Sequence, residues 1–248
     1  MPFTFSHPAI VLPLKKFPKW FSMTGLIIGS LTPDFEYFIR MSDKSIYSHT
    51  LAGIFWYDLP LGILLAFIFH NIVASSFINN LPSAWGSRLS NIKNDNWNNY
   101  FKNYFLIVCV SISIGAASHI FWDGFTHRGG YFVRLFPILK TKLYLSGYPV
   151  PLFNLFQHLS TIAGGLVVLL FIWKLPPDNN IKSAMRMKYW GPIFVISFII
   201  ILVRLLTGSN IDYDDIIMTV ISAGLIGSIL TPILRINFSK DPVKKMIR

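Results

Sequence analysis

The fold of this chain is organised around residues 118–130, which read SHIFWDGFTHRGG and close a long apolar run. The stretch places His119, Asp123 and His127 at intervals of four residues. On a helix such residues share a face, each turned by roughly 40° and displaced by about 6 Å from the one before. Imidazole and carboxylate groups are ligands for zinc and similar divalent ions. The spacing therefore predicts a helix that presents His119 and Asp123 as a metal-binding pair, with His127 near the helix end.

A single His-x-x-x-Asp motif also has an ordinary structural interpretation. A histidine inside a helix bundle is often hydrogen-bonded to a neighbouring helix. An aspartate four residues later can simply mark the boundary between the apolar helix and water. The remainder of the chain has to decide between a metal site and this simpler arrangement.

Composition predicts a membrane protein. The 248 residues are 53% hydrophobic and only 13% charged, which is too apolar for an ordinary soluble domain. Five windows carry no formal charge, and each holds about enough apolar residues to cross a hydrocarbon core of roughly 30 Å. We therefore expect an all-α, polytopic integral membrane bundle with a proline-rich N-terminal arm. The expected transmembrane helices cover roughly residues 51–78, 104–126, 155–174, 190–206 and 213–234.

The net charge of +11 does not indicate nucleic-acid binding. Lysine and arginine lie mostly between the apolar windows, where basic residues meet anionic lipid headgroups. The expected partner is therefore membrane lipid, and the sequence names no protein partner. The single cysteine, Cys109, lies inside an apolar window and supports neither a disulfide nor a thiolate metal site.

Prolines and polar segments divide the rest of the chain. Within residues 1–50 we expect an N-terminal arm, a short helix at about 22–30 and a turn at 31–34. The turn is expected because a proline disfavours the α conformation of the residue before it, here Thr32. Residues 79–103 and 129–152 are expected to form loops.

Five transmembrane spans would place five of the six histidines on one side of the membrane. The sixth, His70, lies well down the first span, where we expect it to bond to a neighbouring helix. Prolines beside His7 and Asp34 reduce the conformational freedom lost when these residues bind an ion. The candidate metal ligands on the common side are His7, Asp34, His49, His119, Asp123, His127 and His158.

The catalytic motifs that are absent narrow the chemistry. The only glutamate is Glu36, which argues against the His-Glu-x-x-His metalloprotease arrangement. No Gly-x-Ser-x-Gly elbow and no Gly-x-x-x-x-Gly-Lys phosphate loop occur. Metal-bound hydroxide needs no glutamate base, and two ions suit phosphoester hydrolysis. We expect Asp123 to be catalytic as a metal ligand and Arg128 to hold a phosphate oxygen, although Arg128 is equally a favourable cation at a helix end.

Four ordered motifs carry a family resemblance: residues 5–9 (FSHPA), 29–34 (GSLTPD), 47–50 (YSHT) and 118–123 (SHIFWD). They resemble the DUF4184 family of bacterial membrane proteins and, in the same order, the membrane-bound metal-dependent hydrolases of the YdjM type. The resemblance covers residues 1–175. It implies a hydrolase-like membrane domain there, followed by two further transmembrane helices and a basic tail in residues 176–248.

More remotely, the order of ligands is similar to zinc-dependent phospholipase C and to nucleases of the P1 type. This chain departs from those enzymes in two ways. They begin with a tryptophan that binds metal, which this chain lacks, and an acidic residue stands four positions after their last histidine, where this chain has Ile162. We therefore expect one or two divalent ions, of the zinc type. The resemblance implies that Asp34, His49, His119 and Asp123 hold one ion, that His7 shares Asp123 on another, and that His127 and His158 serve a further ion.

These observations predict a membrane-bound hydrolase of a phosphoester, with a lipid headgroup or lipid-linked compound as a convenient substrate. Two alternatives stay open: a non-enzymatic membrane protein with a structural metal site, and a proton-coupled transporter in which His70 lines the path with His119 and Asp123. Lysine and arginine are almost evenly divided between the two sides. The family resemblance implies a protein of the bacterial inner membrane. The basic 174–188 loop and C-terminal tail favour a site that faces away from the cytoplasm.

Overall fold

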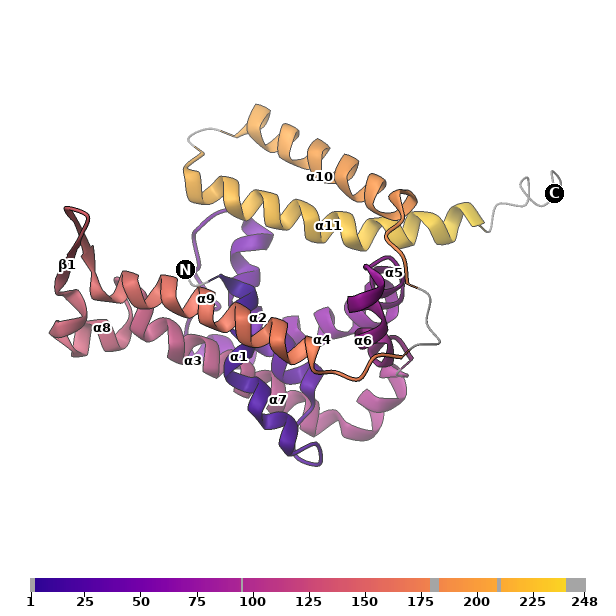
Figure 1. Ribbon diagram of the computed structural model, residues 1–248, viewed down its shortest axis with the longest axis horizontal. Coiled ribbons are helices and arrows are strands. Elements are labelled where there is room, and N and C mark those ends of the chain that lie inside the picture. The colour runs from indigo at the N-terminus through magenta and orange to yellow at the C-terminus, as the bar shows by residue number, and fades with distance from the viewer. Residues whose placement is uncertain (1–2, 95, 179–182, 209–210, 240–248) are drawn as a thin grey trace. The chain divides into compact units, whose positions relative to one another are not determined.

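A computed structural model describes residues 3–94, 96–178, 183–208 and 211–239 of the protein (Figure 1). In this part of the chain every element except one short hairpin is helical. Five helical segments are long and apolar enough to cross a membrane, which confirms the predicted all-α membrane bundle. They are Leu51–Asn79, Trp97–Leu135, Leu152–Trp173, Met187–Thr207 and Tyr213–Leu234.

The N-terminal arm consists of short helical turns. Pro8 and Pro13 each lie in the first turn of such a segment, where a missing backbone N–H breaks no helical hydrogen bond. The elements of this region are η1 (Thr4–Ser6), α1 (Pro8–Val11), η2 (Leu12–Lys16) and α2 (Met23–Arg40).

The expected turn at residues 31–34 is wrong, because α2 continues through Pro33. In an unbroken helix the residue at position 33 would donate its N–H to the carbonyl of Gly29, and proline has no such donor. The hydroxyl of Thr32 donates to that carbonyl instead, at 2.7 Å. Asp34 is consequently a buried residue within a helix and not a cap at the start of one.

The first membrane-crossing segment contains two π-helical turns. It begins at Thr50, whose hydroxyl accepts a hydrogen bond from the N–H of Gly53 at 2.9 Å. In the second π turn the ring of His70 stacks on Trp97, with centroids 4.5 Å apart and planes within 2°. The segment runs through α3 (Leu51–Gly53), the π turn η3 (Ile54–Asp58), α4 (Leu59–Ile68), the π turn η4 (Phe69–Val73) and α5 (Ala74–Asn79).

Both regions expected to be loops contain regular structure. Residues 79–103 include the helix α6 (Ser83–Asn94) and the first turns of α7 (Trp97–Thr126), which bends at Tyr104. Residues 129–152 contain two short helices and a β-hairpin. The helices are α8 (Tyr131–Leu135) and η5 (Pro137–Lys140), and the strands are β1 (Lys142–Leu145) and β2 (Tyr148–Pro151).

Three long helices complete the described chain. They are α9 (Leu152–Trp173), α10 (Met187–Thr207) and α11 (Tyr213–Ser239). Residues 240–248 of the predicted basic tail lie outside the described residues.

The chain forms two compact units. In the second unit α10 packs along α11, the indole N–H of Trp190 donates to the carbonyl of Asn80, and Ser222 donates to the carbonyl of Phe38. All the candidate metal ligands named above belong to the first unit. The first unit comprises Met1–Phe35, Ser45–Ala66 and Phe101–Lys174, and the second comprises Glu36–Lys44, Phe67–Tyr100 and Leu175–Arg248.

Within the first unit, α2 and α7 approach each other through glycines. A Cβ atom on Gly29 would lie 2.2 Å from the backbone oxygen of Ile112, and one on Gly115 would lie 2.4 Å from the oxygen of Leu26. Such contacts are possible only without side chains, as in the small-residue interfaces of membrane helices. This close approach brings the α2 backbone beside the part of α7 that carries His119.

Replacing Gly29 with alanine is expected to force α2 away from α7. The new methyl group would collide with backbone rather than with a movable side chain, so we expect a loss of about 2–3 kcal/mol of stability. Thermal unfolding in detergent measures the change. The matched control is Gly224→Ala in α11, where a Cβ meets nothing within 4 Å and the gain in helix propensity should be neutral or stabilising. Equal unfolding temperatures for the two variants would contradict the proposed contact.

Candidate metal centre

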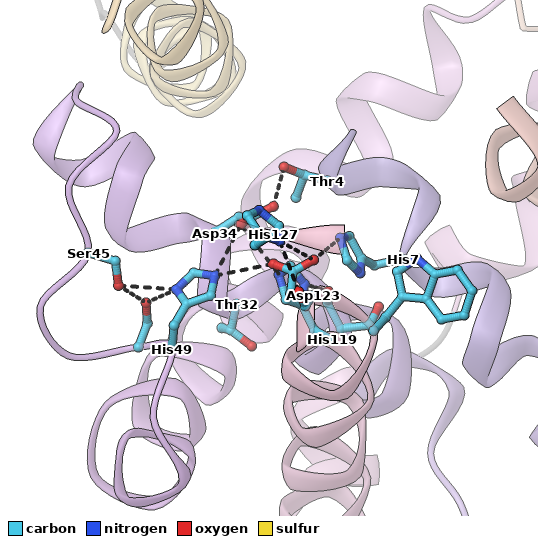
Figure 2. A network of polar contacts seen from close by, with 12 residues as sticks. Thr4, His7, Thr32, Asp34, Ser45, His49, His119, Asp123 and His127 are labelled. Atoms are coloured by element: carbon cyan, nitrogen blue, oxygen red, sulfur yellow. Dashed lines mark hydrogen bonds and ion pairs between the residues drawn. The ribbon is translucent and has the colours of Figure 1, made fainter. Parts of the chain in front are cut away.

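Four segments of the first unit converge on one cluster of imidazoles and carboxylates (Figure 2). His7 stands at the junction of η1 and α1, and Asp34 lies in α2. His49 directly precedes the cap of α3, while His119 and Asp123 lie one turn apart on α7. Figure 2 shows the rings of the three histidines turned toward the two carboxylates.

Four nitrogen–oxygen distances within the cluster are close to those between ligands of a single ion. His119 Nε2 lies 3.4 Å from Asp34 Oδ1 and 3.3 Å from Asp123 Oδ2. His49 Nε2 lies 3.6 Å and 3.7 Å from the same two oxygens. These separations exceed an N–H···O hydrogen bond of about 2.7–3.2 Å. Two ligand atoms each about 2.0–2.1 Å from a tetrahedral ion are separated by about 3.3–3.4 Å, close to the observed values.

The backbone of α2 fixes the orientation of His119. Its Nδ1 lies 2.8 Å from the carbonyl oxygen of Ser30. A carbonyl only accepts hydrogen bonds, so Nδ1 carries a hydrogen and Nε2 is the nitrogen presented to the carboxylates. Metal-binding histidines are held in this manner, with the second ring nitrogen donating to a backbone carbonyl.

The cluster contains buried polar atoms whose hydrogen-bonding capacity is not used within the described residues. They include Asp34 Oδ1, His119 Nε2 and both carboxylate oxygens of Asp123. The remaining oxygen of Asp34 accepts a hydrogen bond from the hydroxyl of Thr4 at 2.5 Å. Buried polar atoms without partners are costly, and a cation at the centre of the cluster would satisfy Asp34 Oδ1, His119 Nε2 and one oxygen of Asp123 at once.

The electrostatics of the cluster favour positive charge between the two carboxylates. Burial opposes ionisation of Asp34, yet the adjacent imidazole of His119 holds the pKa of this carboxyl below its usual range. Burial likewise disfavours protonation of His49, but the nearby carboxylates of Asp123 and Asp34 raise the pKa of this imidazole. The four side chains Asp34, His49, His119 and Asp123 thus form a group whose geometry and charge fit a divalent ion with nitrogen and oxygen ligands.

Nitrogens of two further histidines, His7 and His127, lie near the other carboxylate oxygen of Asp123. His7 Nε2 is 3.6 Å from Asp123 Oδ1, and the His7 ring stacks on His119 with centroids 3.7 Å apart. Burial, followed by the proximity of His119, lowers the pKa of His7 to about 3. His7 is therefore neutral at physiological pH, with both ring nitrogens buried and without a hydrogen-bond partner in the described structure.

His127 also faces Asp123, but in a different manner. Its Nδ1 lies 3.6 Å from Asp123 Oδ1 and 3.2 Å from the backbone carbonyl of the same residue. Since that carbonyl can only accept, Nδ1 carries a hydrogen in this arrangement. His127 is placed beside the cluster and hydrogen-bonded to it, so its direct ligation through Nδ1 would require this bond to break.

The structure does not bring every predicted site residue to the cluster. His158 is exposed on α9, and none of the interactions of the described residues joins it to the other histidines. Arg128 follows His127 directly and is exposed, with its side chain lining a separate pocket. His70 belongs to the second unit.

Several residues that support the cluster were not identified from the sequence. The hydroxyls of Ser45 and Ser48 lie 3.1 Å and 2.9 Å from His49 Nδ1, and Thr4 and Ser30 contact Asp34 and His119 as described above. Serine and threonine are too common in loops to indicate such a role. Ser30 and Ser48 did carry a signal, since they lie inside the motifs at residues 29–34 and 47–50.

A comparison with known families agrees with the family that the four motifs predict. The model of DUF4184, described as a domain of unknown function, matches residues 1–233. The chain belongs to the DUF4184 family. The match extends beyond the motif-bearing residues 1–175 through α10 and into α11. No curated protein and no solved structure matches this DUF4184 chain.

Proposed function

We propose that this DUF4184 protein is a membrane-bound, metal-dependent hydrolase that acts on a phosphoester. The observation that supports it best is the set of four convergent ligand atoms in Asp34, His49, His119 and Asp123, at separations suited to one divalent ion. Imidazole nitrogens and carboxylate oxygens form the usual ligand set of hydrolytic zinc sites. A bound divalent ion supplies a Lewis acid and, from water, a nucleophile available at neutral pH.

The residues of the chain have separate roles in this proposal. Asp34, His49, His119 and Asp123 hold the ion, and the second oxygen of Asp123 extends the carboxylate toward His7. His7 is neutral and buried beside that oxygen, so its ring nitrogens are suited to ligate a second ion. We place the protein in the bacterial inner membrane with this site on the non-cytoplasmic face, supported by the basic 174–188 loop and tail.

The proposal is tested by comparing two histidines of the first membrane-crossing region. Purified protein is reconstituted into liposomes with zinc, and release of phosphate or of a phosphorylated headgroup is measured for a panel of phospholipids. His49→Gln is expected to lower turnover by more than about tenfold, since even outer-shell partners of metal ligands change activity by about 10- to 100-fold. His70→Gln is the control and should retain turnover, because His70 packs on Trp97 in the second unit.

The two variants also separate the hydrolase from the transporter alternative. If His70 lined a proton path with His119 and Asp123, its replacement would abolish activity as completely as replacement of His49. Loss of turnover in both folded variants would therefore contradict the hydrolase proposal, and so would complete absence of turnover in the wild-type protein over the lipid panel.

A structural metal site is the second candidate function, and one feature of the cluster favours it. Four protein ligands already fill a tetrahedral zinc shell, whereas catalytic zinc sites keep a position open. The cluster also joins the N-terminal arm, α2 and α7 within one unit. Against this candidate, the His49 side chain is the most exposed of the four ligands, with 21% of its surface accessible. A structural site would stabilise the protein and give no turnover.

A further inference from the structure

A basic pocket lies beside the end of α7, outside the cluster of metal ligands. The pocket has a volume of about 710 Å³ and is lined by Arg128, Lys140, Lys142 and Asn154 together with two prolines and a phenylalanine. Its lining comes from the turn that follows α7, from η5, from the hairpin and from the start of α9. Four separate elements thus contribute side chains to one cavity, and every polar group among them carries N–H donors.

The positive charge of this pocket is not neutralised by the surrounding chain. Residues 124–177 contain no aspartate or glutamate. Among the described residues, no ion pair involves Arg128, Lys140 or Lys142. Three cations that line one cavity without counter-charge repel each other, and an anion bound between them removes that repulsion.

The donors in the pocket are suited to a phosphate group. The guanidinium of Arg128 offers a planar fork that matches two phosphate oxygens, whereas a lysine ammonium contributes a point charge. Lys140, Lys142 and the amide of Asn154 supply further N–H donors for the remaining oxygens. A phosphate group with a free negative charge offers acceptor oxygens to donors of this kind.

The adjoining hairpin indicates that the phosphate group belongs to a membrane lipid. Ser146 and Gly147 both have positive φ angles, 49° and 85°, which gives the tight two-residue turn of a hairpin. On either side of this turn Tyr144 and Tyr148 are each 75% exposed. Exposed tyrosines next to lysines are typical of the membrane–water interface, where the rings lie among headgroups and the ammonium groups meet phosphates. The base of the hairpin, and with it the pocket, is then at the level of lipid phosphates.

We infer that the basic pocket binds the phosphate group of an anionic membrane lipid. Arg128 is joined to His127 by one peptide bond, so its Cα lies about 3.8 Å from that of a residue beside the metal centre. That the bound lipid is also the substrate rests on the proposed hydrolase function. Binding of the lipid phosphate does not rest on it.

The test measures lipid binding without turnover. The probe is a short-chain phosphonate analogue of phosphatidic acid, whose C–P bond resists hydrolysis, titrated into the full-length protein in detergent. Wild type is compared with Arg128→Gln, Lys142→Gln and the double variant. Arg134→Gln is the matched control, because Arg134 is exposed on α8 but does not line the pocket. Unfolding temperatures confirm that each variant is folded, as expected for exposed side chains.

We expect each pocket variant to weaken binding by about tenfold or more, since each removes at least one hydrogen bond to a charged group. Arg134→Gln should bind like wild type, short-chain phosphatidylcholine should bind at least about tenfold more weakly, and inorganic phosphate should compete only weakly. Equal losses in Arg134→Gln and Arg128→Gln would overturn the pocket. Competition by inorganic phosphate at the affinity of the lipid analogue would overturn the lipid as its ligand.

These experiments test the lipid-binding pocket and the hydrolase function independently. A protein that binds the analogue through Arg128 and Lys142 but shows no turnover would contradict only the proposed hydrolase function. A protein that hydrolyses phospholipids but binds the analogue unchanged in the double variant would contradict only the basic pocket.

Discussion

Asparagine in place of Asp123 is expected to release the metal ion and abolish turnover. One carboxylate oxygen lies 3.3 Å from His119 Nε2, and the other lies 3.6 Å from His7 Nε2, so this residue connects both groups of nitrogens. Asparagine keeps the shape but replaces one oxygen with a donor and removes the charge. Removing one partner of a buried charged pair costs about 3–5 kcal/mol, or about 10²- to 10⁴-fold in affinity.

Elemental analysis of the detergent-purified protein measures this effect beside a turnover assay. Asp214→Asn is the matched control: the same chemical change on an exposed residue in the first turn of α11, in the second unit. It should retain wild-type metal content. A full complement of metal in Asp123→Asn would show that the ion is held elsewhere, and would contradict the assignment of the cluster as a metal centre.

Removal of the ion by a chelator is expected to destabilise the protein. Without a cation, oxygen atoms of the buried Asp34 and Asp123 carboxylates have no hydrogen-bond partner among the described residues. A ligand present at about a thousand times its Kd stabilises the folded state by about 4 kcal/mol. For a chain of roughly this size, that corresponds to a fall of about 10 °C in the unfolding temperature after chelation.

Differential scanning fluorimetry with and without EDTA measures this shift, and added zinc should restore the original unfolding temperature. Asp123→Asn serves as the internal control, because a protein that no longer binds the ion should be insensitive to EDTA. An equal response of the variant and the wild type would indicate that the chelator acts at another position. No response of the wild type would contradict a stabilising ion in the cluster.

The transmembrane helices, and the His119–Asp123 pair of the metal-ligand cluster, were predictable from local sequence. Charge-free apolar windows located all five membrane-crossing segments, because helix length and hydropathy are properties of contiguous residues. The pairing of His119 with Asp123 followed from the helical repeat alone, since residues four apart share a face. The DUF4184 family was likewise recognised from four short motifs and is confirmed by the family match.

Other features depended on contacts that local rules do not describe. The rule that a proline ends a helix failed at Pro33, because the hydroxyl of Thr32 replaces the missing N–H donor. The loop expected at residues 129–152 folds as a hairpin, and only that fold brings Lys142 into one pocket with Arg128. His158 shared the predicted side of the membrane with the cluster, yet it lies exposed on α9.

The sequence alone determined that this protein is a helical membrane protein of the DUF4184 family and that α7 carries a pair of candidate ligands. Only the tertiary structure decided which distant residues complete the set. Asp34 reaches His119 because glycines on α2 and α7 let the two backbones touch, and His49 reaches both carboxylates from the start of another helix. Periodicity describes neighbours along one helix, whereas convergence of separate segments depends on packing over distances that no local pattern records.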